Sequence, residues 1–193
     1  MKICIIRHGE TDWNTIGKLQ GREDIPINDS GIEQIKSTLD YLRKYNWHII
    51  ITSPLLRAKM SAEIIAKGIN TEIREEMDFI ERDYGKASGM TLDERETNFP
   101  NGKWPGIESI ESLQKRTVAA LLKYIKEYSG YNIIIISHGL AIDSILSFLS
   151  NHEIGVEKTS LRNGSITLLE KNEDRINILF FNKVASEITD NTT

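Results

Sequence analysis

The chain has 193 residues, of which 39% are hydrophobic and 27% are charged, a composition typical of one globular domain with a sizeable core. Its net charge of −4 and its isoelectric point near 5.7 exclude a general polyanion-binding protein, so no nucleic acid partner is expected. No apolar run approaches the length of a membrane span, so no membrane partner is expected either.

Two features predict a soluble protein of the cytoplasm. The single cysteine, Cys4, lies within an apolar run and has no partner for an intrachain disulfide, which fits a reducing compartment. A strand that begins at residue 2 or 3 leaves no room for a signal peptide.

Strand and helix patterns alternate in the first part of the chain. Residues 3–6 are continuously apolar and predict a strand buried on both faces. Ser30 and Glu33 are spaced as a capping box and predict the start of an amphipathic helix. A second buried strand is predicted over residues 48–52, and a short third strand over residues 72–74.

Two further helices are predicted from their ends. Ser53-Pro54 starts one of them, because proline near the first helical position loses little by lacking an N–H, and this helix runs to about Lys67, where Gly68 stops it. Ser109 opens a long amphipathic helix that ends at Gly130.

The last part of the chain predicts a strand, a helix and a hairpin. Residues 133–136 form a fourth buried strand and residues 140–149 a short apolar helix. A closing hairpin is predicted from two strands over residues 166–169 and 176–181, joined by the polar residues 171–175. Alternating strands and helices predict an α/β fold, a three-layer sandwich with a mostly parallel sheet and helices on both faces.

One segment breaks this alternation. Residues 78–108 are rich in charge, contain two prolines and four glycines, and lack clean periodicity, which predicts a substrate-covering loop region, hereafter the covering segment. We expect a single domain over residues 1–185 and a polar, disordered tail over residues 186–193.

Two predicted strands end in the same dipeptide. The first runs into Arg7-His8-Gly9 and the fourth into His138 followed by glycine, while Arg57 lies in the first turns of the helix after the second strand. Glycine allows a tight bend and a close approach to a ligand, histidine can attack or transfer protons, and arginine suits phosphate. Ligands of open α/β sheets bind beyond the carboxyl ends of the strands, so we expect these side chains to converge on an anion.

This ordered set of motifs resembles the histidine phosphatase superfamily, in its phosphoglycerate mutase-like branch. The similarity spans nearly the whole chain up to the closing strands, and the matching pieces follow the order of the family. They are Arg7-His8-Gly9-Glu10-Thr11, Trp13-Asn14, Gln20-Gly21, Ser53-Pro54-Leu55-Leu56-Arg57-Ala58, Glu81-Arg82-Asp83-Tyr84-Gly85 and Ser137-His138-Gly139.

The resemblance implies a role for each of five residues. His8 is the nucleophile that becomes phosphorylated, and Arg7, Arg57 and His138 surround the transferred phosphoryl group. Glu81 matches the acid that gives a proton to the leaving oxygen. These roles fit the chemistry, because fixed cationic donors stabilise the charge of the phosphoryl group and nearby arginines keep His8 neutral enough to attack.

The resemblance also implies contacts to substrate or phosphate from the residues Asn14, Gln20, Gly21, Arg82 and Gly139, although Arg82 fits a surface role equally well. The chemistry requires no metal, and the sequence shows no recognisable metal-ligand spacing. No cofactor is expected, except bisphosphoglycerate if the protein is a mutase.

Two departures from the family pattern fall in the covering segment. Gly85 is followed by Lys86-Ala87-Ser88-Gly89, so the glutamate usual in the phosphatases is missing, and Ile107 interrupts a Gly-Gly-Glu-Ser pattern. Both bear on the identity of the substrate more than on the type of reaction.

Three functions remain to be compared. We expect a phosphomonoesterase acting on a small phosphorylated metabolite. The alternative is a phosphoglycerate mutase, favoured by the motif that begins at Glu81 and opposed by the short chain. A non-catalytic sensor of a phosphorylated ligand ranks lowest, because such relatives lose the nucleophile or an arginine. A homodimer is left open.

Overall fold

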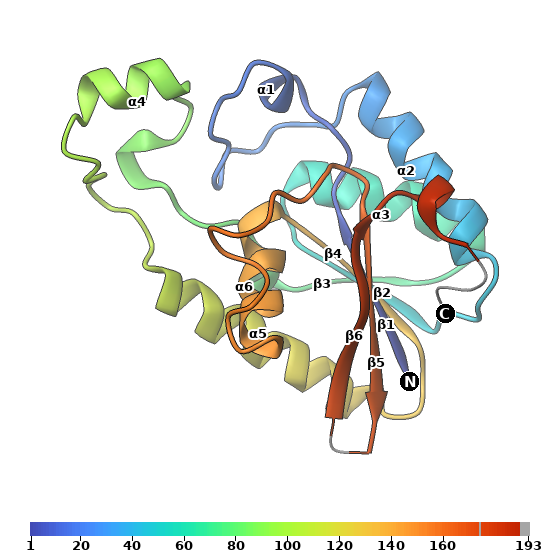
Figure 1. Ribbon diagram of the computed structural model, residues 1–193. Helices are drawn as coiled ribbons and strands as arrows, with labels where there is room; N and C mark the ends of the chain where they lie inside the picture. The colour runs from blue at the N-terminus through green and yellow to red at the C-terminus, as the bar shows by residue number, and fades with distance from the viewer. Residues whose placement is uncertain (174, 190–193) are drawn as a thin grey trace.

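The computed structural model describes residues 1–173 and 175–189, which form one six-stranded sheet with helices packed around it (Figure 1). The order of the strands is β3-β2-β4-β1-β5-β6; the first four are parallel to one another, β5 is antiparallel to β1, and β6 is antiparallel to β5. The strands are β1 (Lys2–Arg7), β2 (Ile49–Thr52), β3 (Ile73–Glu75), β4 (Ile133–Ser137), β5 (Ile166–Asn172) and β6 (Arg175–Lys183).

Helices cover both faces of this sheet and complete three layers, as expected. In Figure 1, α5 and α6 lie to the left of the sheet, while α2 and α3 lie on its other side. The two short helices α1 and α4 lie beyond the carboxyl end of β1. The helices are α1 (Asp12–Thr15), α2 (Asp29–Leu42), α3 (Leu56–Ile69), α4 (Leu92–Asn98), α5 (Ile110–Glu127) and α6 (Gly139–Leu149).

The apolar run in β1 serves both faces of the sheet. Ile3 and Ile5 pack in the core beneath α5 and α6, whereas Cys4 and Ile6 pack in the core beneath α2 and α3. The four isoleucines of β4 alternate between the two cores in the same way. Burying each such side chain stabilises the fold by roughly 1.5–3 kcal/mol, so both central strands are firmly fixed.

The ends of α2 and α3 differ from the sequence prediction. Asn28 caps α2 by accepting the N–H of Gly31 at 2.9 Å, so Ser30 lies inside the helix and forms no capping box with Glu33. Gly68 also lies inside its helix, which ends one residue later. A Cβ on Gly68 would lie 2.5 Å from the Leu39 side chain, so this glycine permits the close packing of α2 against α3.

The covering segment is more regular than predicted. It contains α4, which begins with a capping box between Thr91 and Glu94, a signal that the periodicity of the sequence did not reveal. Near its two ends, Tyr84 pairs with Ile107 in an isolated antiparallel bridge. The segment therefore has its own internal hydrogen bonds.

The predicted polar tail is ordered where the structure describes it. Ser186 lies in a short 3₁₀ helix, Ile188 is buried against the core beneath α2 and α3, and Glu187 pairs with Arg162 at 2.5 Å. The remaining tail residues, 190–193, lie outside the described residues. Within the described ranges, no helix is both long enough and apolar enough to span a membrane.

Candidate active site

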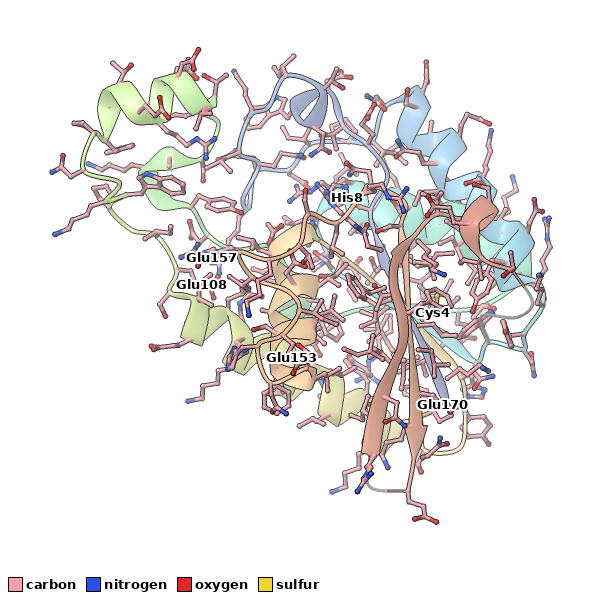
Figure 2. The ribbon with its side chains drawn as sticks, viewed as in Figure 1. Cys4, His8, Glu108, Glu153, Glu157 and Glu170 are labelled. Carbon is pink, nitrogen blue, oxygen red and sulfur yellow. The ribbon has the colours of Figure 1, made fainter. Side chains whose placement is uncertain are left out.

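Strand register explains why His8 and His138 meet. Strands β1 and β4 are parallel neighbours, and Arg7 pairs with Ser137, so both histidines follow their strands at the same level. The N–H of His8 donates to the carbonyl of Ser137 at 3.0 Å, and the two imidazole centroids are 5.1 Å apart. Figure 2 shows His8 at the end of the sheet nearest α1.

A small cavity of about 110 Å³ opens beside His8. It brings together seven of the ten predicted site residues, together with three residues that the sequence analysis did not select. The lining consists of Arg7, His8, Asn14, Lys18, Leu19, Gln20, Gly21, Arg57, Glu81 and Tyr84. His138, Arg82 and Gly139 do not line this cavity.

His8 is prepared as a neutral nucleophile. Its Nδ1 lies 2.7 Å from the carbonyl oxygen of Gly9, which can only accept, so Nδ1 carries the proton and Nε2 keeps its lone pair. Burial first, and then the positive charges of Arg57 and Arg7, hold the pKa of His8 well below its usual 6.5. The imidazole is therefore unprotonated at Nε2 at neutral pH.

The loop after β1 owes its shape to a glycine pair. Gly9 does not have a positive φ, so its need for glycine comes from the close approach of another segment. A Cβ on Gly9 would lie 2.5 Å from the carbonyl oxygen of Gly31, and a Cβ on Gly31 would lie 2.3 Å from the carbonyl oxygen of Glu10. The two glycines thus let this loop press against the first turn of α2, which fixes the position of His8.

Backbone carbonyls hold the two arginines. Arg57 is fully buried and donates to the carbonyls of Gly21 and Glu23, each at 2.7 Å. Arg7 donates to the carbonyl of Leu161. Burial lowers the pKa of Arg57 to about 10, so its guanidinium stays charged at neutral pH.

Three buried side-chain nitrogen atoms at this site lack hydrogen-bond partners among the described residues. They are Nε of Arg7, Nε of Arg57 and Nδ1 of His138. Burial of an unpaired donor costs about 1–3 kcal/mol, so folded proteins rarely keep several of them together. An anionic ligand with several acceptor oxygens is the kind of group that satisfies such a set.

Glu81 joins the covering segment to α6. Its Oε1 accepts the N–H of Arg82 at 2.8 Å and of Ala141 at 3.1 Å, and its Oε2 accepts the N–H of Leu140 at 3.2 Å. These donors belong partly to the N-terminus of α6, where the helix dipole also favours a negative charge. The carboxyl group is nearly buried in the cavity wall.

The remaining predicted residues take different places. Asn14 lines the cavity, and its Oδ1 accepts from Asn163, which also donates to the carbonyl of His8 at 3.1 Å. Arg82 turns away and donates from Nε to the carbonyl of Glu108 at 2.7 Å. Gly139 lies in the first turn of α6, close to the Arg7 guanidinium.

The sequence analysis missed several residues that shape the site. Lys18 and Leu19 line the cavity from between Asn14 and Gln20, and their position between two motif pieces was the available signal. Tyr84 belongs to a motif that was noted, yet no role was given to it. Asn163 follows no recognised motif, so no sequence signal pointed to it.

Arg116 on α5 is another missed residue, and it anchors the start of the covering segment. It pairs with the carboxylate of Glu108 at 2.8 and 2.9 Å, and it donates to the carbonyls of Asp78, Ile80 and Glu81 at 2.8–3.0 Å. Figure 2 shows Glu108 beside the start of α5. This network fixes the backbone that carries Glu81.

The described residues hold no cluster of three or more His, Cys, Asp or Glu side chains arranged to bind a metal ion. Positive charge at the cavity comes instead from Arg7, Arg57 and Lys18.

An α/β sandwich that gathers a neutral histidine, one buried and one partly buried arginine, and a carboxyl group at the ends of parallel strands defines a site for phosphoryl chemistry. The chain belongs to the histidine phosphatase superfamily (branch 1), whose family model matches residues 3–184.

Relatives agree with this membership, and a solved structure shares the fold. Over 180 residues the chain is 40% identical to the uncharacterized phosphatase PhoE of Bacillus subtilis (strain 168), with 93% of each chain covered. It is 29% identical to the probable phosphoglycerate mutase GpmB of Salmonella choleraesuis (strain SC-B67), with 91% of this chain and 87% of the relative covered. The structure of Bacillus stearothermophilus YhfR shares the fold, with a TM-score of 0.86, 22% identity and 92% and 94% of the two chains covered.

Proposed function

We propose that this protein is a phosphomonoesterase that hydrolyses a small phosphorylated metabolite through a phosphohistidine on His8. The supporting observation is the set of three unpartnered buried nitrogen atoms of Arg7, Arg57 and His138 near a neutral imidazole. The relative with 40% identity is described as a phosphatase, which favours the same type of reaction.

In the first step Nε2 of His8 attacks the phosphorus atom and forms a P–N bond. The P–O ester bond breaks, its electron pair goes to the leaving oxygen, and the carboxylic acid form of Glu81 gives that oxygen a proton. The guanidinium groups of Arg7 and Arg57 and the imidazole of His138 donate to the phosphoryl oxygens, where negative charge is spread in the transition state.

In the second step water replaces the alcohol. Glu81, now a carboxylate, takes a proton from a water molecule whose oxygen attacks phosphorus, and the P–N electron pair returns to His8 Nε2. The three backbone N–H groups around Glu81 stabilise this carboxylate between the two steps. Splitting the displacement through a covalent intermediate replaces one difficult step with two easier ones.

The mutase remains the alternative, because the relative with 29% identity is described as a probable phosphoglycerate mutase. The position of Arg82 argues against it. Mutases of the family carry an arginine there, but here Nε of Arg82 donates to Glu108 and the residue does not line the cavity.

A direct assay separates these functions. The purified protein is incubated with p-nitrophenyl phosphate, phosphoserine and 3-phosphoglycerate, with and without 2,3-bisphosphoglycerate, and free phosphate and isomerised product are measured. We expect phosphate release that does not need bisphosphoglycerate, and an acid-labile phosphoprotein that His8→Ala abolishes. Isomerisation that depends on bisphosphoglycerate supports the mutase, and turnover unchanged by His8→Ala contradicts both enzyme proposals.

A further inference from the structure

Ser53 touches His138, and the proposed reaction has not used this contact. Ser53 follows β2 directly and is fully buried, and its N–H donates to the carbonyl of Ile136 at 3.0 Å. Because β2 and β4 are parallel neighbours, Ser53 and His138 emerge side by side at the same edge of the sheet. The Ser53 Oγ lies 2.7 Å from Nε2 of His138.

The hydrogen-bond partners of Ser53 indicate which of the two groups donates the hydrogen in this contact. Its Oγ accepts the N–H of Leu55 at 3.3 Å, so the lone pairs of Oγ are partly occupied. Among the described residues, Leu55 and His138 are the partners found for this oxygen. The hydroxyl hydrogen therefore has one acceptor within reach, which is Nε2 of His138.

We propose that Ser53 donates its hydroxyl hydrogen to Nε2 of His138 and thereby keeps the imidazole proton on Nδ1, where it serves as a donor to the bound phosphoryl oxygen. Ser53 is thus a positioning residue that acts through His138. The inference rests on the proposed function for the identity of the ligand, but the location of the proton is a property of the free protein.

The opposite tautomer is costly. If Nε2 carried the proton, the buried Ser53 hydroxyl hydrogen would have no acceptor, and Nδ1 would direct a lone pair toward an anionic ligand. Each unpaired buried group costs about 1–3 kcal/mol. With the proton on Nδ1, one donor remains unpaired in the free protein, and a phosphoryl oxygen satisfies it.

The ring must also be neutral for this tautomer to exist. Burial first, and then the positive charges of Arg57 and Arg7, keep the pKa of His138 well below 6.5. Arg116 acts in the same direction from α5. His138 therefore supplies a neutral donor, and the formal charge at the site comes from the arginines.

Long-range ¹H–¹⁵N correlation spectra of the full chain labelled with ¹⁵N-histidine test the proposal without any turnover. The chain has four histidines, and the loss of signals in His138→Gln assigns His138. At neutral pH and without ligand, we expect Nδ1 of His138 to be protonated and Nε2 to be unprotonated. In Ser53→Ala we expect this pattern to change to the other tautomer or to a mixture.

Affinity for orthovanadate, measured by calorimetry, provides the second readout. Ser53→Ala should weaken binding by about ten- to a hundredfold, the loss expected for one hydrogen bond to a charged group. Ser53→Thr keeps a hydroxyl group and should preserve both the tautomer and most of the affinity. The matched control is Thr52→Val, which removes a neighbouring buried hydroxyl that donates to the Ser53 carbonyl at 3.1 Å and should change neither readout.

Two results overturn the proposal. One is a wild-type His138 with its proton on Nε2. The other is a folded Ser53→Ala protein whose nitrogen spectrum and vanadate affinity both match the wild type. Failure of the wild-type protein to release phosphate from any phosphomonoester contradicts the proposed function instead, because the tautomer measurement does not depend on turnover.

Discussion

The carboxyl group of Glu81 accepts the backbone N–H of Ala141 at 3.1 Å, which places it on the first turn of the helix that follows His138. The two residues are 60 positions apart in the chain. One helix terminus therefore orders two parts of the candidate site, the second histidine and the proton donor.

Replacement of Glu81 should affect substrates according to their leaving groups. An alkoxide is a poor leaving group that needs a proton, so Glu81→Ala should reduce kcat for alkyl phosphates by about 10²–10⁴-fold. p-Nitrophenolate leaves without this help, so the phosphorylation step with p-nitrophenyl phosphate should slow far less. Pre-steady-state release of nitrophenolate, compared with that of an alkyl alcohol, measures the difference. Equal losses for the two substrates would remove Glu81 from the acid role.

Lys18 should contribute a long-range charge to ligand binding. It is half-buried in the cavity lining, its Nζ lies 5.4 Å from the Trp13 ring centroid, and it forms no ion pair with the described residues. Lys18→Met keeps the apolar stem and removes the charge, so KM for phosphomonoesters should rise roughly two- to fivefold, less at high salt. Lys36→Met, which removes a lysine paired with Glu33 at 2.7 Å, is the control and should leave KM unchanged. A KM unaffected by Lys18→Met at low salt would contradict this role.

Arg116 should matter for the covering segment. Arg116→Lys loses the planar guanidinium group that donates to Glu108 and to three backbone carbonyls. Several of these partly buried acceptors are then left unpaired. We expect a loss of at least about 2 kcal/mol in the free energy of unfolding, together with a lower kcat, because the backbone of Glu81 is no longer fixed. Urea unfolding and steady-state kinetics measure both. An unchanged kcat in a destabilised variant would show that the anchor supports folding alone.

The sequence predicted the centre of the sheet well for a physical reason. Strands β1 and β4 are buried on both faces, so their apolar runs are continuous, and polar residues that follow them have to lie at one edge of the sheet. The placement of His8 and His138 followed from those runs and from a topology rule. The prediction that Arg57 lies at the site followed from its position in the first turn of α3.

Features that depend on contacts between distant segments were not predictable in the same way. Gly68 resembled a helix stop, and only the Leu39 side chain packed against it shows why glycine is needed inside α3. The capping-box spacing favoured Ser30 as the N-cap of α2, whereas Asn28 caps this helix in the structure. Arg116 and Asn163 act through backbone carbonyls, which leave no trace in a sequence motif.

Acidification should destabilise the protein through its two buried histidines. In the unfolded chain His8 and His138 take up protons near pH 6.5, whereas burial keeps both neutral in the folded state. The unfolded state then binds more protons below about pH 6.5. As the pH is lowered through this range, the free energy of unfolding decreases by up to about 1.4 kcal/mol per pH unit for each histidine. Unfolding by urea between pH 7.5 and about pH 5 measures this slope.

Asp143 opposes this effect at lower pH and offers an internal check. Burial raises its pKa to about 6, so the folded state binds this proton more readily than the unfolded state below that pH. Asp143→Asn should therefore steepen the loss of stability below pH 6, while His138→Gln should make it shallower.

The glycine pair beside His8 gives a test that separates fold from chemistry. A Cβ on Gly31 would lie 2.3 Å from the carbonyl oxygen and 2.6 Å from the amide nitrogen of Glu10, so the backbone itself has to move. We expect Gly31→Ala to cost about 1–3 kcal/mol of stability and to displace the loop that carries His8, which lowers kcat in the protein that still folds. The control is Gly17→Ala, where the added Cβ has no neighbour within 4 Å and the positive φ alone costs about 1 kcal/mol. A Gly31→Ala protein with wild-type stability and kcat would show that α2 does not set the position of the nucleophile.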